Sequence, residues 1–176
     1  MEKALKLNPR DGGVLADRGM LLAHLGRCDE AAAEVRKAEK VVLGAPWIHY
    51  SIAEAHLFFF YYDCPDHYDL TEALRHAEAT YEVYPANEYA LAIQALALLR
   101  KGDYTEAKRI YLELFKENPD GMSWFPLAIC LWHLGEKAEA RRVYDRSVTW
   151  MEERPPDSPA LINMRQEAAE LLGIEP

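Results

Sequence analysis

The stretch EYALAIQALALLRKGDYTEAKRIYLELFKENP, residues 88–119, contains two apolar-periodic segments on either side of a short polar turn. From 88 to 100 the alanines and leucines recur at helical spacing. Gly102 then favours a helix end, because a residue without Cβ adopts the left-handed conformation readily. Asp103, with a glutamate three residues later, is typical of a helix N-cap, and Pro119 ends the second segment. The stretch therefore predicts a helical hairpin with a tight turn.

The same skeleton recurs along the chain. Small alanines anchor four copies, and their residue numbers differ by 42, 34 and 33: Ala31, Ala73, Ala107 and Ala140. A period in the middle thirties indicates stacked helical hairpins. We therefore predict an all-α, right-handed α-solenoid of about four helix pairs with a C-terminal capping helix. The predicted units are 12–45, 46–87, 88–120 and 121–154, preceded by a partial helix at 1–9 and followed by the capping helix at 155–176.

The second unit is longer than the others, and its extra residues fall at 61–68. We interpret this insertion as a loop that adds little stability, because loop length enters the closure entropy only logarithmically. Residues 1–9 resemble the end of a second helix from a preceding unit. Either the chain begins in mid-array or it carries a short stub. In both cases Leu15, Leu21 and Leu22 present apolar surface at this end, which favours self-association.

These residues resemble the tetratricopeptide repeat (TPR) family, whose pattern is W-x2-L-G-x2-Y, then A-x3-F, then Pro. The third and fourth units match it through Leu91, Ala95, Gly102, Tyr104, Ala107, Tyr111 and Pro119, and through Trp124, Leu127, Ala128, Leu131, Gly135, Ala140 and Tyr144. The second unit departs most, because it has no glycine between its helices. These two matching units are also similar to C-terminal repeat arrays of large bacterial signalling proteins. The resemblance implies TPR-like helix pairs and a protein–protein interaction module.

The resemblance also implies a concave binding surface formed by the first helix of each unit. Its residues here are mostly apolar and aromatic, which is typical of anchors for a peptide or helix of a partner. Some of them, particularly Trp47 and Ile129, could instead pack against neighbouring units. The predicted partner-binding residues are Met20, His24, Trp47, Tyr50, Glu54, Phe58, Tyr89, Leu96, Arg100, Met122, Phe125, Ile129 and His133. The alternatives are a homo-oligomeric assembly or scaffold subunit and, more remotely, an enzyme or a metal-handling protein.

Composition narrows the class of partner and the location. The net charge of −9 opposes attraction to a phosphate backbone, so we expect no nucleic acid. The longest apolar patch, 57–62, is too short to cross a membrane. The chain start lacks the apolar run of a secretory signal, and three cysteines at unrelated spacings favour reduced thiols. We therefore predict a cytoplasmic protein, with Cys28 and Cys130 as small core residues.

Motifs for chemistry are missing from the sequence. It contains no glycine-rich phosphate loop, nucleophile elbow or HExxH motif, so we predict that the chain is not an enzyme and uses no cofactor. Four histidines fall in the second unit, at His49, His56, His67 and His76. Without HxxxH or CxxC spacing, we interpret them as surface or half-buried side chains and predict no metal site.

Overall fold

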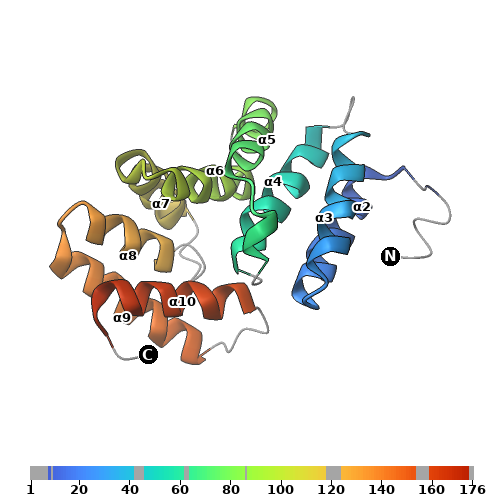
Figure 1. Ribbon diagram of the computed structural model, residues 1–176. Helices are drawn as coiled ribbons and strands as arrows, with labels where there is room; N and C mark the ends of the chain where they lie inside the picture. The colour runs from blue at the N-terminus through green and yellow to red at the C-terminus, as the bar shows by residue number, and fades with distance from the viewer. Residues whose placement is uncertain are drawn as a thin grey trace. The chain divides into compact units, whose positions relative to one another are not determined.

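The computed structural model describes residues 8, 10–41, 46–61, 64–85, 87–117, 124–153 and 159–174, and all regular structure in these residues is helical (Figure 1). The all-α prediction is confirmed. The elements are α2 (Gly12–His24), α3 (Cys28–Glu39), α4 (Pro46–Tyr61), the 3-10 turn η1 (Pro65–His67), α5 (Leu70–Val83), α6 (Glu88–Lys101), α7 (Tyr104–Glu117), α8 (Trp124–His133), α9 (Lys137–Glu153) and α10 (Pro159–Leu172).

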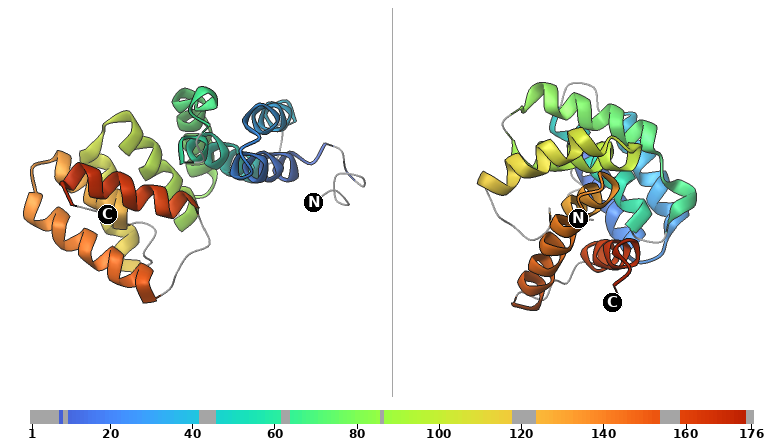
Figure 2. Two further views of the ribbon diagram at one scale, coloured as in Figure 1. Left: turned by 60° about the horizontal axis from the view of Figure 1, so that its bottom comes forward. Right: turned by 90° about the vertical axis from the view of Figure 1, so that its left-hand side faces the viewer.

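The chain forms two compact units, which differ from the four predicted repeat units. From here on, residues 1–93 are the first unit and residues 94–176 the second unit, and the boundary lies within α6. In the first unit α2 packs against α3 and α4, and α4 packs against α5. In the second unit α8 packs against α7, α9 and α10, and α10 also contacts α9. Figure 2 shows the helices of each unit in two further views.

Local signals explain where the helices begin and end. Gly26, Gly102 and Gly135 have φ values of 71°, 88° and 83°, the left-handed conformation that favours glycine, so the predicted helix ends are confirmed. The side chain of Asp69 accepts hydrogen bonds from two backbone N–H groups in the first turn of α5. Asp103 accepts one from the first turn of α7, at 3.3 Å. The predicted N-cap at Asp103 is thus confirmed, and Asp69 caps α5 in the same way.

Each unit has its own apolar core. In the first unit the core joins α2, α3 and α4 through buried residues that include Leu15, Val35, Ile52 and Phe59. In the second unit the largest fully buried side chains include Tyr111, Phe125, Leu127, Leu131 and Leu172. Leu172 belongs to α10, and Leu161 and Met164 of the same helix are also buried. The last helix therefore covers apolar surface, as predicted for a capping helix.

The prediction of reduced thiols is wrong for two of the three cysteines. Cys28 and Cys64 form a disulfide, with a Cα–Cα distance of 5.5 Å. Cys64 directly precedes η1 and lies against α3. It is 2% exposed, and its N–H donates a hydrogen bond to the Phe59 carbonyl. The insertion is therefore anchored in the core at Cys64, and the small effect of this loop on stability stays a prediction. Cys130 is a buried free thiol, as predicted, and burial raises its pKa to about 12.

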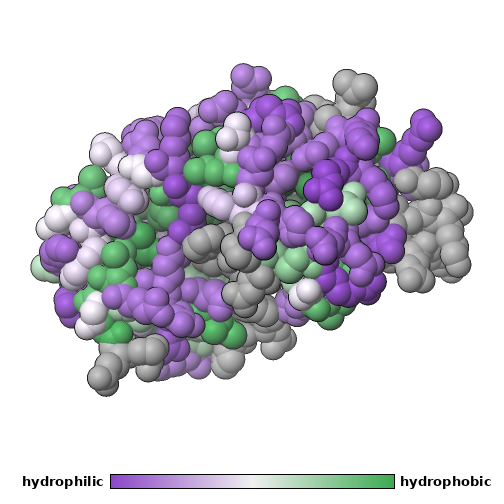
Figure 3. Space-filling view, in the orientation of Figure 1, coloured by the Kyte–Doolittle hydropathy of each residue, from purple (hydrophilic) through white to green (hydrophobic). Residues whose placement is uncertain are grey.

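Hydrophilic residues cover most of the face shown in Figure 3, and the hydrophobic ones form small separate groups. No helix within the described residues is both long enough and apolar enough to span a bilayer. Apart from residue 8, the predicted partial helix at 1–9 lies outside the described residues, as does the groove residue Met122.

Candidate functional site

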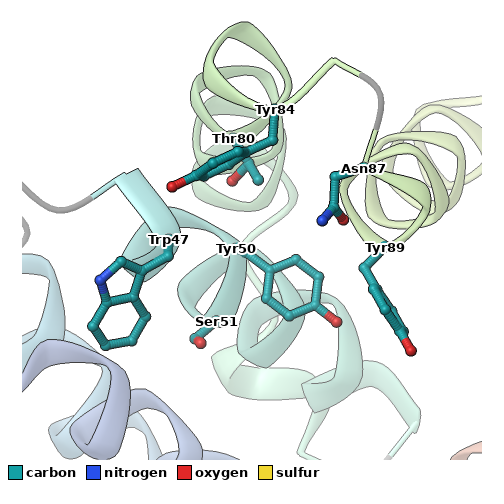
Figure 4. Close-up of a pocket in the computed structure, with 7 residues that line it drawn as sticks. All are labelled: Trp47, Tyr50, Ser51, Thr80, Tyr84, Asn87 and Tyr89. Atoms are coloured by element: carbon teal, nitrogen blue, oxygen red, sulfur yellow. The ribbon is translucent and has the colours of Figure 1, made fainter.

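Four aromatic side chains surround an open pocket in the first unit (Figure 4). Trp47 and Tyr50 project from α4, Tyr84 caps the C-terminus of α5, and Tyr89 lies in the first turn of α6. The cavity has a volume of about 260 Å³, and its polar lining residues are Ser51, Thr80 and Asn87. Trp47, Tyr84 and Tyr89 remain 49%, 40% and 70% exposed. Large aromatic side chains are therefore available to a ligand at this place.

Three of these rings pack against other residues of the unit. The Tyr50 and Tyr89 rings meet edge to face, with centroids 6.4 Å apart and planes at 74°. The Trp47 indole lies against the backbone of α2 at Gly13, where an added Cβ would overlap the ring. Because Gly13 has no side chain, the indole can lie flat there while one edge faces solvent. The pocket walls are thus set before any ligand arrives.

Acidic groups stand behind the pocket. Glu54, one turn along α4 from Tyr50, hydrogen bonds to the Tyr50 side chain. Burial, together with the nearby charge of Asp17, raises the pKa of Glu54 to about 7. Burial raises the pKa of Asp17 as well, with Asp11 adding to it. With a pKa of about 7, Glu54 is only partly ionised at neutral pH, and a cation bound nearby would favour its charged form.

The other predicted residues of the first unit do not line this pocket. Met20 is partly buried against the core, Phe58 is buried, and His24 is exposed in the last turn of α2. The pocket instead includes Tyr84 and Asn87, which the sequence reasoning missed. That reasoning considered only the first helix of each unit, whereas these two residues follow the second helix. An aromatic residue directly after α5 was the available signal.

In the second unit, the predicted groove residues are not an open surface. Leu96, Phe125 and Ile129 are buried, and Phe125 is 0% exposed. The prediction of exposed anchors is wrong for these three residues. Phe125 and Ile129 belong to α8, against which α7, α9 and α10 all pack. The Phe125 ring meets Tyr144 of α9 edge to face, at 5.7 Å between centroids.

Two polar residues of the predicted groove in the second unit already have partners. Arg100 forms a bidentate ion pair with Glu167 of α10, with both N–O distances 2.6 Å. The exposed His133 ring stacks on Tyr104, with centroids 4.1 Å apart. An acidic group of the chain itself therefore takes the place that a partner's carboxylate would need at Arg100.

A second, polar pocket of about 300 Å³ lies in the first unit between α3, α4, α5 and the η1 turn. Its lining includes Glu39, His56 and Glu72, and His76 lies beside Glu72. The interpretation of these histidines as surface or half-buried is wrong for His56 and His76, which are both buried. Burial, and then the neighbouring Arg75, lowers the pKa of His76 to about 3. Its imidazole is therefore neutral.

Comparison with known proteins identifies the repeat. A family model described as "Tetratricopeptide repeat" matches residues 66–107 and 94–159, and a second with the same description matches 12–37. TTC0263, a thermophilic TPR protein from Thermus thermophilus, is similar at 20% identity and a TM-score of 0.66, covering 98% of this chain and 87% of its own. MamA from AMB-1 is similar at 17% identity and a TM-score of 0.53, covering 91% and 88%. At these identities the likeness concerns the fold. A comparison with curated proteins gave no match.

Proposed function

Because this chain belongs to the tetratricopeptide repeat family, we propose that it is a protein–protein interaction module that binds a peptide or helix of a partner at the aromatic pocket of the first unit. The observation that carries the proposal is the group of aromatic side chains that stay exposed around one cavity. Exposed aromatic clusters of this kind mark interaction sites, because a large rigid ring contributes contact area at low entropy cost. Of the predicted residues, Trp47, Tyr50 and Tyr89 support it.

The chemistry of the pocket favours a basic side chain of the partner. The faces of tryptophan and tyrosine rings attract lysine and arginine, by about 0.5–2 kcal/mol depending on exposure. The lining residues in the described part of the chain include no basic side chain, and the acidic residues Glu54 and Asp17 lie near Tyr50. The net charge of −9 also favours a basic partner. We therefore expect the partner segment to insert a lysine or arginine between the rings.

A displayed library of random peptides, selected on the purified protein, tests this proposal. We expect the enriched peptides to share a lysine or arginine next to apolar residues. Trp47→Ala and Tyr89→Ala should each weaken binding of an enriched peptide by about tenfold to thirtyfold, as for truncated hot-spot aromatics. Glu113→Ala is the matched control, because this side chain is exposed on α7. Peptides that bind equally well to both pocket variants would place the site elsewhere.

Gly13→Ala offers a variant that changes no residue of the pocket lining. The added methyl group displaces the Trp47 indole from α2, so we expect peptide binding to fall while the helix content measured by circular dichroism is kept. If binding were unchanged although Trp47 fluorescence showed that the ring had moved, Trp47 would have no part in recognition.

A second candidate function, a homo-oligomeric scaffold subunit, is favoured by one observation. Leu21 and Leu25, at the end of α2 and in the turn after it, are 50% and 59% exposed. If this surface joins two copies, the mass measured by light scattering should rise with concentration, and Leu21→Gln should abolish the rise.

A cytoplasmic location is no longer favoured by the cysteines, because a disulfide is typical of oxidising compartments.

A further inference from the structure

We propose that the polar pocket of the first unit binds a divalent zinc-type ion through Glu39 of α3 and Glu72 and His76 of α5. Each of these residues offers one ligand atom, and the three atoms lie within 4.8 Å of one another. Ligands about 2.1 Å from a tetrahedral zinc ion are roughly 3.4 Å apart, so small side-chain rotations complete the geometry. This site is independent of the aromatic pocket and of its partner.

Burial distinguishes this group from a surface acidic cluster. His76 is fully buried, and both glutamates are only partly exposed. One nitrogen and two carboxylate oxygens suit zinc, whereas magnesium and calcium prefer oxygen ligands alone. Three protein ligands also leave a fourth position, which a water from the adjoining cavity of about 300 Å³ can fill.

Two further histidines hold the ligands in place. His49 Nδ1 lies 2.7 Å from His76 Nδ1, so the two imidazoles share a hydrogen bond that fixes the orientation of the buried ring. His56 Nε2 lies 2.8 Å from Glu39 Oε1 and fixes that carboxylate in the same way. Metal ligands commonly have such hydrogen-bonded supports, which set the ring orientation and the basicity of the ligand. All five side chains come from three helices that pack together.

A positive group already stands among the proposed ligands. Arg75 Nη2 lies 2.5 Å from Glu72 Oε2 and 2.6 Å from His76 Nε2. The Arg75 side chain is about half exposed, so it can swing into solvent when a metal ion takes over these two atoms. The guanidinium therefore competes with the metal, and its removal should strengthen metal binding. If the ion pair of Arg75 were purely structural, removing Arg75 would not strengthen metal binding, since no metal would replace the lost arginine.

The test is calorimetric titration of ZnCl₂ into the tag-free full chain, after treatment with a chelator and dialysis. Reducing agents are left out, so that Cys28 and Cys64 stay paired and offer no thiolate. We expect saturable binding of one Zn²⁺ per chain, and at least a hundredfold weaker response to MgCl₂. Absence of saturable zinc binding, or equal binding of MgCl₂, would overturn the proposal.

Variants assign the ligands. We expect Glu72→Gln and His76→Gln to weaken zinc binding at least tenfold, and Arg75→Gln to tighten it severalfold. Glu72→Gln keeps the assignment testable if the buried His76→Gln does not fold, because Glu72 is partly exposed. His24→Gln is the matched control on α2 and should bind as the natural chain does. If His24→Gln weakened binding as much as Glu72→Gln, or if neither Glu72→Gln nor Arg75→Gln changed it, the assignment would be wrong.

Discussion

Tyr89 of the first unit and Phe125 of the second unit both belong to the predicted partner-binding stripe, on α6 and α8, yet their surroundings differ. Tyr89 is 70% exposed beside an open pocket, whereas Phe125 is 0% exposed inside a core. Phe125 lies on α8, against which α7, α9 and α10 all pack, and its ring meets Tyr144 of α9. A position within the repeat therefore does not determine whether a side chain is free to bind. The helices that pack against it determine whether that side chain is free.

The largest effect should come from removing α10, by deleting residues 157–176. Leu161, Met164 and Leu172 are buried in the second unit, and burying each is worth about 1.5–3 kcal/mol. We expect the second unit to lose roughly 5 kcal/mol of stability, measured by urea unfolding, and to bind a hydrophobic dye. Unchanged unfolding would show that α10 is not what closes this core.

Phe125→Ala and Tyr89→Ala compare one ring of each unit by the stability that its removal costs. Deleting a fully buried aromatic ring costs about 3–5 kcal/mol, because a cavity remains. Tyr89→Ala is the comparison, and its exposed ring should change the free energy of unfolding by only about 0.5 kcal/mol. Similar losses of stability for both variants would remove the contrast between the two units.

The pH dependence of stability should depend on Glu54. Its pKa of about 7 in the folded chain exceeds the ordinary 4.5, so the folded state binds more protons between these values. Stability from this group is therefore greatest below about pH 4.5 and falls as the pH rises through 7, by up to about 3 kcal/mol. We expect Glu54→Gln to melt at a higher temperature than the natural chain at pH 8, with the gap closing toward pH 5. An equal gap at both pH values would show that Glu54 ionises normally.

A smaller effect distinguishes the ion pairs of the second unit. The Arg100 and Glu167 side chains are 11% and 29% exposed, whereas Arg109 and Glu113 are both more than half exposed. We expect Glu167→Gln to cost about 2 kcal/mol and Glu113→Gln at most about 0.5 kcal/mol, since solvent screens the outer pair. Thermal unfolding of the two variants side by side measures the difference, and the reverse order would contradict it.

The features predicted from sequence are those that local chemistry decides. Gly102 and Asp103 set a turn and a cap through their own backbone and side chain, so the hairpin could be predicted without its neighbours. Trp47, Tyr50 and Tyr89 could be named from the concave surface that the family resemblance implies, but their meeting with Tyr84 depends on how α5 packs.

Features that depend on distant parts of the chain could not be predicted. The burial of Phe125 depends on the helices that pack against α8, and no periodicity within α8 reveals them. Similarly, Cys28 and Cys64 are 36 residues apart in sequence, and only the turn before η1 brings them together. The group formed by Glu39, Glu72 and His76 combines residues from two helices, so no short sequence motif indicates it.

The disulfide makes part of the chain a covalent ring, with Cys28 and Cys64 as its closure and most of α3 and all of α4 inside it. A protease that cuts the backbone once within this ring leaves both pieces attached to one another. The Trp47 and Tyr50 walls of the aromatic pocket lie inside the ring, while Tyr84 and Tyr89 lie outside it. A single nick there therefore separates no wall of the pocket from the rest of the molecule until the sulfur bridge is also reduced.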